Sequence, residues 1–197
     1  MALLRSTDSS AASSLIEGKN VYLRYPQLSD YEAWAKLREE SRAFLVPWEP
    51  VWPSDDLTRA AFRRRIKRYG NDIKDDIAYP FFVFRASDGA LAGGATVSNV
   101  RRGVAQTCNL GYWVGEKFAR TGLISAAVQS LFPFVFGTLK LNRIESACLP
   151  NNVPSQGLLR KVGYTEEGYA RKYLKINGIW QDHLLFALIK DDLNPSN

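Results

Sequence analysis

Two segments of the chain have residue types and spacings that suit a phosphate-bearing ligand. In the first, an apolar strand ends at residues 111–115, GYWVG, and the chain continues through residues 120–122, RTG, into a good helix opening. Where a strand passes through a small glycine-containing loop into a helix, unpaired backbone NH groups meet the positive end of the helix dipole. The segment therefore predicts a cradle for phosphate groups, although an ordinary strand-to-helix turn has the same residues.

The second segment, residues 150–155, reads PNNVPS and opens another helix, which ends at Gly163. Ser155 follows Asn152 by one helical turn, where a hydroxyl can protonate a departing thiolate directly or through water. Asn and Ser are also common helix caps, and that interpretation stays open. The two segments together indicate a coenzyme A site.

Around these segments the chain alternates short strands and helices, which predicts a single mixed α/β domain. We expect strands at residues 21–25, 79–86, 91–97, 108–114, 143–148, 164–176 and 179–189. We expect helices at residues 30–42, 57–69, 122–137 and 155–163. Asn177-Gly178 predicts a tight hairpin turn, and Pro133 is expected to bend or interrupt its helix.

The composition fits one domain with a full core, since 46% of the 197 residues are hydrophobic. The net charge of +6 permits an anionic cofactor or a ribonucleoprotein partner but does not by itself indicate nucleic-acid binding. Cys108 and Cys148 lack the spacing of a metal or redox pair, so we expect buried thiols in a reducing compartment. No stretch has the roughly 20 apolar residues of a membrane span, and we expect a cytoplasmic protein.

Two further segments are candidates for contacts with a partner. Residues 44–53, FLVPWEPVWP, carry three prolines, so we expect a loop of the kind that often lines a site. The expected helix 57–69 is rich in arginine and lysine. It is either a solvated helix face or a weak contact surface for RNA or the ribosome.

Five motifs in one order give the chain a resemblance to the GNAT superfamily of acetyl-CoA-dependent N-acetyltransferases. Within it the chain resembles the RimJ/RimL type, and most closely the branch of ribosomal-protein alanine N-acetyltransferases. The motifs are residues 44–50 (FLVPWEP), 110–115 (LGYWVG), 122–124 (GLI), 163–169 (GYTEEGY) and 180–183 (WQDH). The resemblance implies the GNAT fold, with a central, mostly antiparallel, twisted sheet of about seven strands flanked by about four helices. It covers a domain at residues 20–193, between a flexible tail at 1–19 and a short tail at 194–197.

The resemblance implies acetyl-CoA as the acetyl donor and no metal. The cofactor-binding residues it implies are Trp113, Val114, Gly115, Arg120, Thr121, Gly122, Leu123 and Asn152. The family pattern at the phosphate loop is Gln/Arg-x-x-Gly-x-Gly/Ala, and here only Gly122 matches it. Because backbone NH groups do most of the phosphate binding, these departures are tolerable if the loop keeps its shape.

The catalytic and acceptor-binding residues follow from the same resemblance. Many relatives have a tyrosine acid where this chain has Leu159, so the role of general acid moves to Ser155. Some relatives have a glutamate base at the position of Ala147; Glu145 lies on the same strand face and is either a base through a water chain or a surface residue. For the acceptor we expect contacts from Trp48, Glu49 and Tyr112.

Three functions remain open. The first is acetylation of the N-terminal amine, with alanine as the first residue, of a ribosomal or other protein. The second is acetylation of a small amine such as an antibiotic, a polyamine or an amino acid. The third is a non-catalytic module that binds acetyl-CoA or the ribosome. A monomer or a homodimer, without membrane association, is expected in each case.

Overall fold

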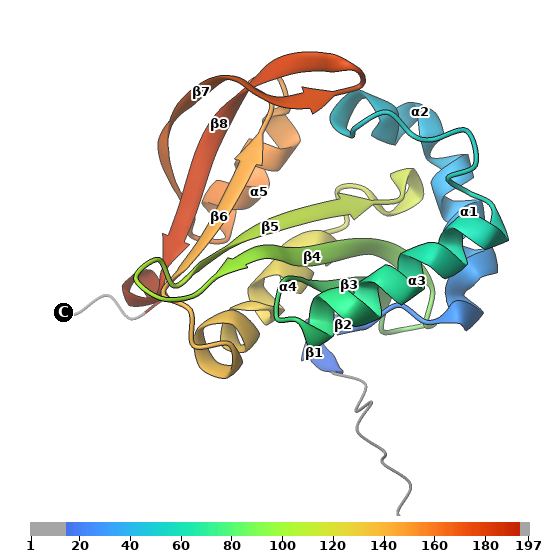
Figure 1. Cartoon of the computed structure of the whole chain (residues 1–197), viewed down its shortest axis with the longest axis horizontal. Helices are drawn as coiled ribbons and strands as arrows, with labels where there is room; N and C mark the ends of the chain where they lie inside the picture. Colours follow the sequence, from blue (N-terminus) through green and yellow to red (C-terminus); the bar gives the residue numbers. More distant parts are fainter. Residues whose placement is uncertain (1–14, 194–197) are drawn as a thin grey trace, which may run out of the picture.

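The computed structural model describes residues 15–193, and the expected tails at 1–14 and 194–197 lie outside the described residues. Within that range eight strands form one sheet, in the order β1-β2-β3-β4-β5-β6-β8-β7 (Figure 1). The strands are β1 Ile16–Gly18, β2 Val21–Arg24, β3 Tyr79–Arg85, β4 Leu91–Arg101, β5 Thr107–Val114, β6 Arg143–Cys148, β7 Thr165–Ile176 and β8 Ile179–Ile189.

The sheet is mostly antiparallel, as predicted, because only β5 and β6 run parallel. It has one strand more than expected. Ile16–Gly18, which we had placed in the flexible tail, pairs with β2 as strand β1. Three residues are too few for a readable alternation of apolar and polar side chains, so this strand had no signal in the sequence.

Five α-helices accompany the sheet within the described part of the chain. They are α1 Tyr31–Glu40, α2 Arg42–Leu45, α3 Arg59–Lys74, α4 Leu123–Ser130 and α5 Val153–Lys161. Short 3₁₀ turns cover Leu28–Asp30, Val46–Trp48, Glu116–Phe118 and Lys190–Leu193. The expected interruption at Pro133 is confirmed, since α4 ends at Ser130 and Pro133–Thr138 is a π-helical turn.

The segment predicted as a loop by its prolines is partly helical. Val46–Trp48 continues α2 as a 3₁₀ turn. Pro47 lies in the first turn of that element, where a backbone NH has no intrahelical partner to lose. The prediction of an irregular segment was therefore wrong for these residues.

The helices cover both faces of the sheet, and two neighbouring phenylalanines of β3 show which helix lies on which face. Phe82 packs toward Phe62 of α3, whose ring also contacts Trp34 of α1 at 4.8 Å between centroids. Phe81 points the other way and meets Phe134, just after α4, at 5.4 Å. Because successive side chains of a strand alternate, α1 and α3 lie on one face and α4 on the other. Figure 1 shows α3 in front of the sheet, with α4 and α5 behind it.

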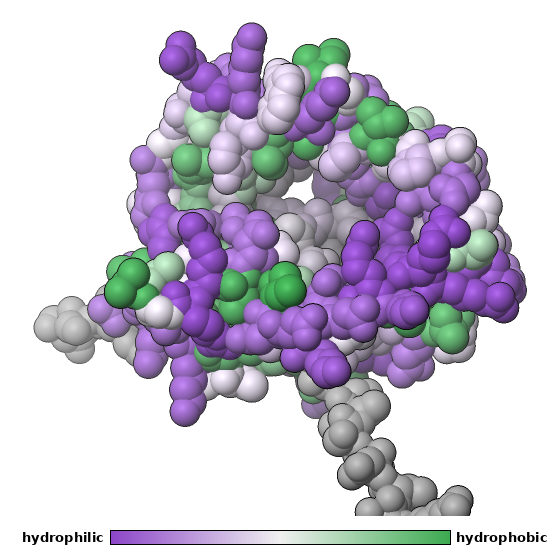
Figure 2. Space-filling view, viewed as in Figure 1, coloured by the Kyte–Doolittle hydropathy of each residue, from purple (hydrophilic) through white to green (hydrophobic). Residues whose placement is uncertain are grey.

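β5 and β6 stay together over only part of their length. They pair from Thr107↔Arg143 to Asn109↔Glu145, and no pairing joins Gly111–Val114 of β5 to β6. The Ser146 hydroxyl donates to the Leu110 carbonyl at 2.9 Å, where the two strands separate. Beyond that point they diverge, and Figure 2 shows an opening through the molecule between β5 and the β7–β8 hairpin.

The β7–β8 hairpin closes the far side of this opening. Its turn residues Asn177 and Gly178 both have positive φ, 45° and 80°, as the predicted tight Asn-Gly turn requires. The Asn177 NH donates to the carbonyl of Glu49 at 2.8 Å. The hairpin tip is thereby joined to the segment after α2, and a continuous ring of backbone surrounds the opening.

The close approach of β4 and β5 predicts a stability effect at Gly93. A Cβ at Gly93 would collide with the Trp113 backbone carbonyl, which cannot turn away as a side chain can. Gly93→Ala is expected to lower the free energy of unfolding by about 2 kcal/mol, as overpacking typically does. Gly70→Ala is the control: it has open space in α3 and should stabilise by up to about 1 kcal/mol. Urea unfolding of both variants measures this, and an unchanged midpoint for Gly93→Ala would contradict the packing of β4 on β5.

Candidate active site

The start of α4 has the geometry of an anion-binding loop. Gly122 is its N-cap, with φ +83°, and Arg120 also has a positive φ, 60°. The Thr121 hydroxyl donates to the Phe118 carbonyl at 2.7 Å and so fixes the loop. The first NH groups of a helix lack intrahelical acceptors, and here they begin at Leu123 beside exposed residues. Arg120, Thr121, Gly122 and Leu123, which the sequence predicts as a phosphate cradle, thus lie together in one loop at the start of α4.

The start of α5 is built around Asn152. Its side-chain oxygen accepts the backbone NH of Ser155 at 3.1 Å, so Asn152 is the helix cap. The cap uses the side-chain oxygen of Asn152. The side-chain NH₂ is left for a ligand, since no described residue accepts a hydrogen bond from this group. It also fixes the first turn of α5 through the backbone of Ser155, which leaves the Ser155 hydroxyl to other partners.

That hydroxyl meets the Tyr112 hydroxyl. Ser155 Oγ and Tyr112 Oη lie 2.8 Å apart, although the residues come from α5 and β5. Burial raises the pKa of the Tyr112 phenol, and the hydrogen bond to Ser155 acts in the opposite direction. Tyr112 therefore stays protonated at neutral pH and can serve as a donor. Sequence reasoning placed it with the acceptor, and the structure places it against the expected acid.

The Cys148 thiol belongs to the same neighbourhood. Burial raises its pKa, while a hydrogen bond to Ser155 lowers it. Its side chain is 5% exposed, and Cys108 is fully buried. Both cysteines are therefore buried thiols, as the sequence predicted.

The end of β5 has backbone groups on the open side. The Gly115 NH donates to the Ala92 carbonyl at 2.9 Å, on the β4 side. Because successive NH groups of a strand alternate in direction, the Val114 NH points away from β4, toward the gap left by β6. An extended ligand can lie along residues 112–114 there as an added strand.

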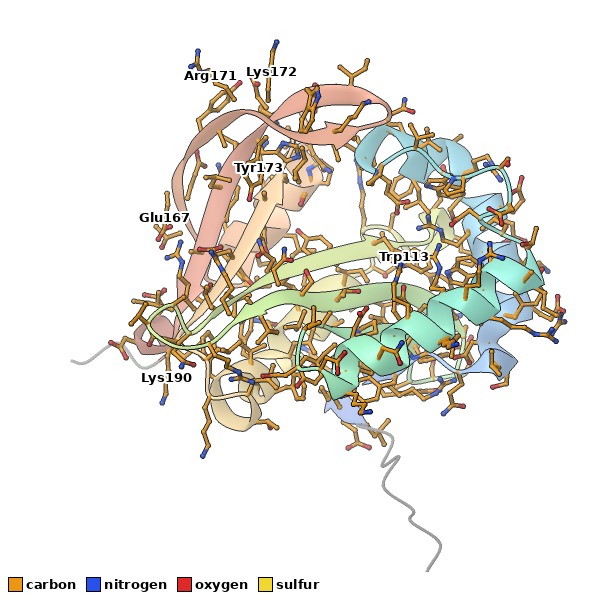
Figure 3. The ribbon with its side chains drawn as sticks, viewed as in Figure 1. Trp113, Glu167, Arg171, Lys172, Tyr173 and Lys190 are labelled. Atoms are coloured by element: carbon orange, nitrogen blue, oxygen red, sulfur yellow. The ribbon has the colours of Figure 1, made fainter. Side chains whose placement is uncertain are left out.

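Glu49 is held by an arginine and a tryptophan. Its carboxylate forms two hydrogen bonds with the Arg38 guanidinium, at 2.7 and 2.6 Å, and accepts the Trp52 indole NH at 2.8 Å. The guanidinium lies over the ring of Trp52 at 4.1 Å and that of Trp113 at 5.0 Å, with Trp113 at the end of β5 (Figure 3). We call these four residues the Arg38 cluster. Trp48, also expected near the acceptor, ends the turn directly before Glu49.

Sequence reasoning missed Arg38 and Trp52. A signal for Arg38 existed, because it follows Trp34 by four residues and so lies on the core-facing side of α1. A charged residue on that side needs a buried partner. Neither the partner nor the tryptophan that covers it was readable from spacing, since Glu49 and Trp52 come from a separate segment.

Glu145 lies apart from the Ser155 group. Its carboxylate is engaged by Arg143 at 2.9 Å and Arg101 at 3.1 Å. It is on the half-buried face of β6, opposite the face that carries Cys148. The sequence expected a possible base here, and the structure shows a carboxylate in ion pairs with two arginines.

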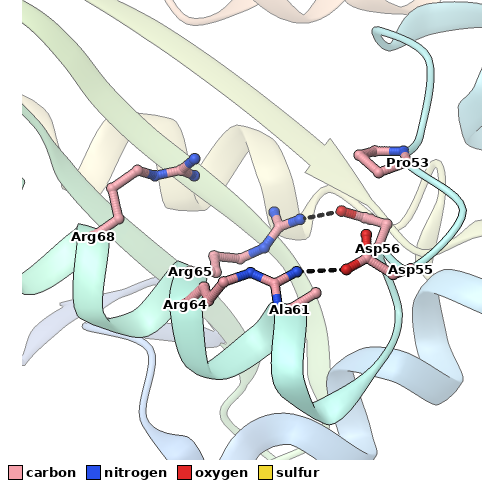
Figure 4. A pocket seen from close by; sticks show the side chains of 7 residues that line it. All are labelled: Pro53, Asp55, Asp56, Ala61, Arg64, Arg65 and Arg68. Atoms are coloured by element: carbon pink, nitrogen blue, oxygen red, sulfur yellow. Dashed lines mark hydrogen bonds and ion pairs between the residues drawn. The ribbon is translucent and has the colours of Figure 1, made fainter.

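The basic helix α3 is partly neutralised by ion pairs within the molecule. Arg64 pairs with Asp55 and Arg65 with Asp56, each at 2.5 Å, beside a shallow pocket of about 260 Å³ (Figure 4). Arg59 pairs with Glu32. These ion pairs favour the interpretation of α3 as a solvated helix face. In residues 15–193 no helix is long and apolar enough to cross a membrane, and no three His, Cys, Asp or Glu residues gather as metal ligands.

Comparison with known proteins identifies relatives over most of the chain. Residues 20–165 match the model of the acetyltransferase (GNAT) domain. The chain is 34% identical to the probable N-acetyltransferase YjcK of Bacillus subtilis, over 90% of this chain and 98% of that protein. It is 35% identical to the [ribosomal protein uS5]-alanine N-acetyltransferase of Escherichia coli, over 84% of this chain and 87% of that protein.

Solved structures agree in fold. Mycobacterium smegmatis RimJ in complex with CoA-disulfide superimposes with a TM-score of 0.85 at 29% identity, over 93% of this chain and 90% of that one. The ribosomal-protein-S5-alanine acetyltransferase of Vibrio fischeri gives a TM-score of 0.83 at 29% identity, over 92% and 99%.

The buried ion pair in the Arg38 cluster predicts a large stability effect. Arg38→Met leaves the Glu49 carboxylate without its main partner, and removing one member of a buried pair costs about 3 kcal/mol. Arg64→Met is the matched control, since both members of the Arg64–Asp55 pair are more than half exposed, and it should cost less than about 1 kcal/mol. Chemical unfolding compares the two variants, and equal losses would mean that the buried pair is no stronger than a surface one.

Proposed function

Because the chain belongs to the GNAT family of acetyltransferases, we propose that it acetylates the N-terminal amine, with alanine first, of a ribosomal or other protein. One observation carries the proposal. At the opening beside β5, the starts of α4 and α5, which suit an anionic donor, lie on one face of the sheet, and the Arg38 cluster lies on the other face. Donor and acceptor enter from opposite faces and meet at the Tyr112–Ser155 pair. A cytoplasmic location, where ribosomal proteins are made, accords with this function.

The residues at the start of α4 fit acetyl-CoA. The left-handed Gly122 leaves open space where a side chain would stand, and Arg120 adds a positive charge at an exposed position. Arg120, Thr121, Gly122 and Leu123 would hold the pyrophosphate through backbone NH groups. Asn152 and the open edge of residues 113–115 would hold the pantetheine arm, whose thioester supplies the acetyl group.

The reacting carbonyl needs a donor for the negative charge that develops on its oxygen. The Val114 NH points into the gap and has no partner among the described residues, whereas the Gly115 NH is occupied by Ala92. Val114 is therefore the backbone donor assigned to the oxyanion.

Ser155 is the proposed general acid. As the amine nitrogen bonds to the acetyl carbon and the carbon–sulfur bond breaks, Ser155 Oγ gives its proton to the sulfur. Tyr112 Oη, 2.8 Å away, returns a proton to Ser155 and is itself reprotonated by solvent, which takes up the proton that the amine loses. The raised pKa of Tyr112 keeps this hydroxyl protonated across the neutral range.

A strong base is not required for an N-terminal amine. Its ordinary pKa is about 8, so a useful fraction is neutral near pH 7 and water can take the remaining proton. Glu145, held by two arginines, keeps at most an indirect role.

Glu49 is proposed to orient the acceptor. A carboxylate has about four lone-pair positions, and the Arg38 cluster uses three of them on Glu49. One position remains for an NH of the acceptor. Glu49 thus aligns the amine without removing its proton, and Trp48 lines the same approach.

The function is tested by an acceptor screen with acetyl-CoA. Ten-residue peptides that differ only in the first residue, and a set of small amines, are compared by intact mass and by release of free thiol. We expect Ala-starting peptides to be acetylated fastest, with a rate that rises with pH through about 8 as the amine loses its proton. Fast turnover of a small amine with slow turnover of every peptide would support a small-amine acetyltransferase instead. Cofactor binding without turnover of any acceptor would support a binding module.

Two conservative variants test the acid. Ser155→Ala should lower kcat by about 100-fold, the usual contribution of general acid catalysis, and Tyr112→Phe by about tenfold, because the acid loses its proton relay. Acetyl-CoA affinity should change little, since the cap at Asn152 uses the Ser155 backbone and survives. Ser130→Ala, which removes a hydroxyl bonded only to its own helix, is the control. Full activity in Ser155→Ala would refute the assignment.

A further inference from the structure

The tip of the β7–β8 hairpin concentrates exposed apolar side chains. We define the hairpin tip as residues 171–181 together with Val51, which lies against Gly178. Five of the twelve large apolar residues exposed in residues 15–193 lie here: Val51, Tyr173, Leu174, Ile179 and Trp180. Val51 and Ile179 are each 62% exposed and Trp180 57%. Gathered apolar exposure of this kind marks interaction sites, whereas single exposed residues do not.

The hairpin tip also carries positive charge without an ion-pair partner among the described residues. Arg171, Lys172 and Lys175 are exposed, and none forms an ion pair within residues 15–193. The Asp182 carboxylate accepts hydrogen bonds from the Tyr169 hydroxyl at 2.6 Å and the Lys172 NH at 2.7 Å, and it forms no ion pair with these cations. Figure 3 shows Arg171 and Lys172 projecting outward from the hairpin, away from the opening. The charge is therefore available to a partner.

The hairpin tip stands at the acceptor's entrance. The hydrogen bond from Asn177 to the Glu49 carbonyl joins it directly to the segment that holds the Arg38 cluster. Tyr173, on the inner side of the hairpin, packs edge-on against the buried His183. A small amine inside the opening would not touch the outward residues, whereas the body of a larger acceptor would.

The mixture of side chains favours a protein over the alternatives. RNA-binding surfaces combine cations with aromatic rings on which bases stack. The hairpin tip has two exposed rings, but Tyr173 lies on the inner side against His183, which leaves Trp180 as the one outward ring among these five residues. Val51, Leu174 and Ile179 are aliphatic and offer no stacking face. A second copy of this chain, docked tip to tip, would bring the three cations against themselves. A protein with apolar and acidic side chains near its N-terminus meets neither obstacle.

We propose that the hairpin tip docks the folded body of the protein acceptor while its N-terminal segment enters the opening. The docking rests on the proposed function, because it assigns the partner of the same site. Apolar contact supplies the affinity and the three cations attract acidic side chains of the acceptor. The tip thus selects folded proteins over short peptides with the same first residues.

The test compares one acceptor in two forms: full-length ribosomal protein uS5, and a peptide of its first ten residues. For the unmodified enzyme, kcat/KM for the protein is expected to exceed that for the peptide by about tenfold, mainly through KM. Ile179→Ser/Trp180→Ser and, separately, Arg171→Glu/Lys175→Glu should remove most of this advantage. Both should leave the peptide's kcat/KM within about twofold, which also shows that the variants are folded. Val104→Ser, another exposed apolar residue in the β4–β5 turn, is the matched control and should change neither value.

Each other outcome is decisive. Equal kcat/KM for protein and peptide in the unmodified enzyme, or a protein advantage that survives both double variants, overturns the docking proposal while the function stands. A 20-nucleotide single-stranded RNA is added as a competitor of full-length uS5. Inhibition of uS5 acetylation by this RNA, with loss of the inhibition in Arg171→Glu/Lys175→Glu, would assign the tip to RNA and overturn protein docking. If neither form of uS5 nor any screened peptide is acetylated, the proposed function itself fails.

Discussion

The separation of β5 from β6 is the constraint on which the rest of the site depends. Two parallel strands that paired to their ends would bury the NH groups of Tyr112 and Val114 in a ladder and leave no room for a ligand. Here the Leu110 carbonyl accepts a hydrogen bond from the Ser146 hydroxyl, and the backbone pairing of β5 with β6 does not continue beyond it. A single side-chain hydrogen bond thus stands where the sheet divides, and it keeps the end of β5 free on one edge.

On both sides of that separation, the site residues are held by contacts with residues from other elements of the fold. On one side, Asn152 caps α5 and so aims Ser155 at Tyr112. On the other, the Arg38 guanidinium, which lies over two indole rings, holds the Glu49 carboxylate, and the Glu49 carbonyl accepts a hydrogen bond from the Asn177 NH at the hairpin turn. The opening is therefore lined by groups whose positions are set before any ligand binds, which reduces the entropy lost when donor and acceptor are brought together.

The sequence predicted those parts of the site that are local in the chain. The glycine-containing loop that opens a helix at Gly122, the cap at Asn152 and the Asn177-Gly178 turn each follow from the conformational preferences of a few adjacent residues. The mostly antiparallel sheet and the interruption at Pro133 were also predicted. The pairs Tyr112–Ser155 and Arg38–Glu49 were not, because partners 43 and 11 residues apart become neighbours only through the topology. Glu145 was selected for its strand face, and spacing alone could not reveal the two arginines that engage it.

The two-sided opening has a consequence for the order of events in a catalytic cycle. Sites on opposite faces of one sheet do not compete for space, so neither ligand blocks the path of the other. No cysteine near the opening is poised to carry the acetyl group, because burial keeps the Cys148 thiol protonated. The architecture therefore suits a ternary complex with direct transfer, in which initial-rate plots intersect, and not a ping-pong exchange through a modified enzyme.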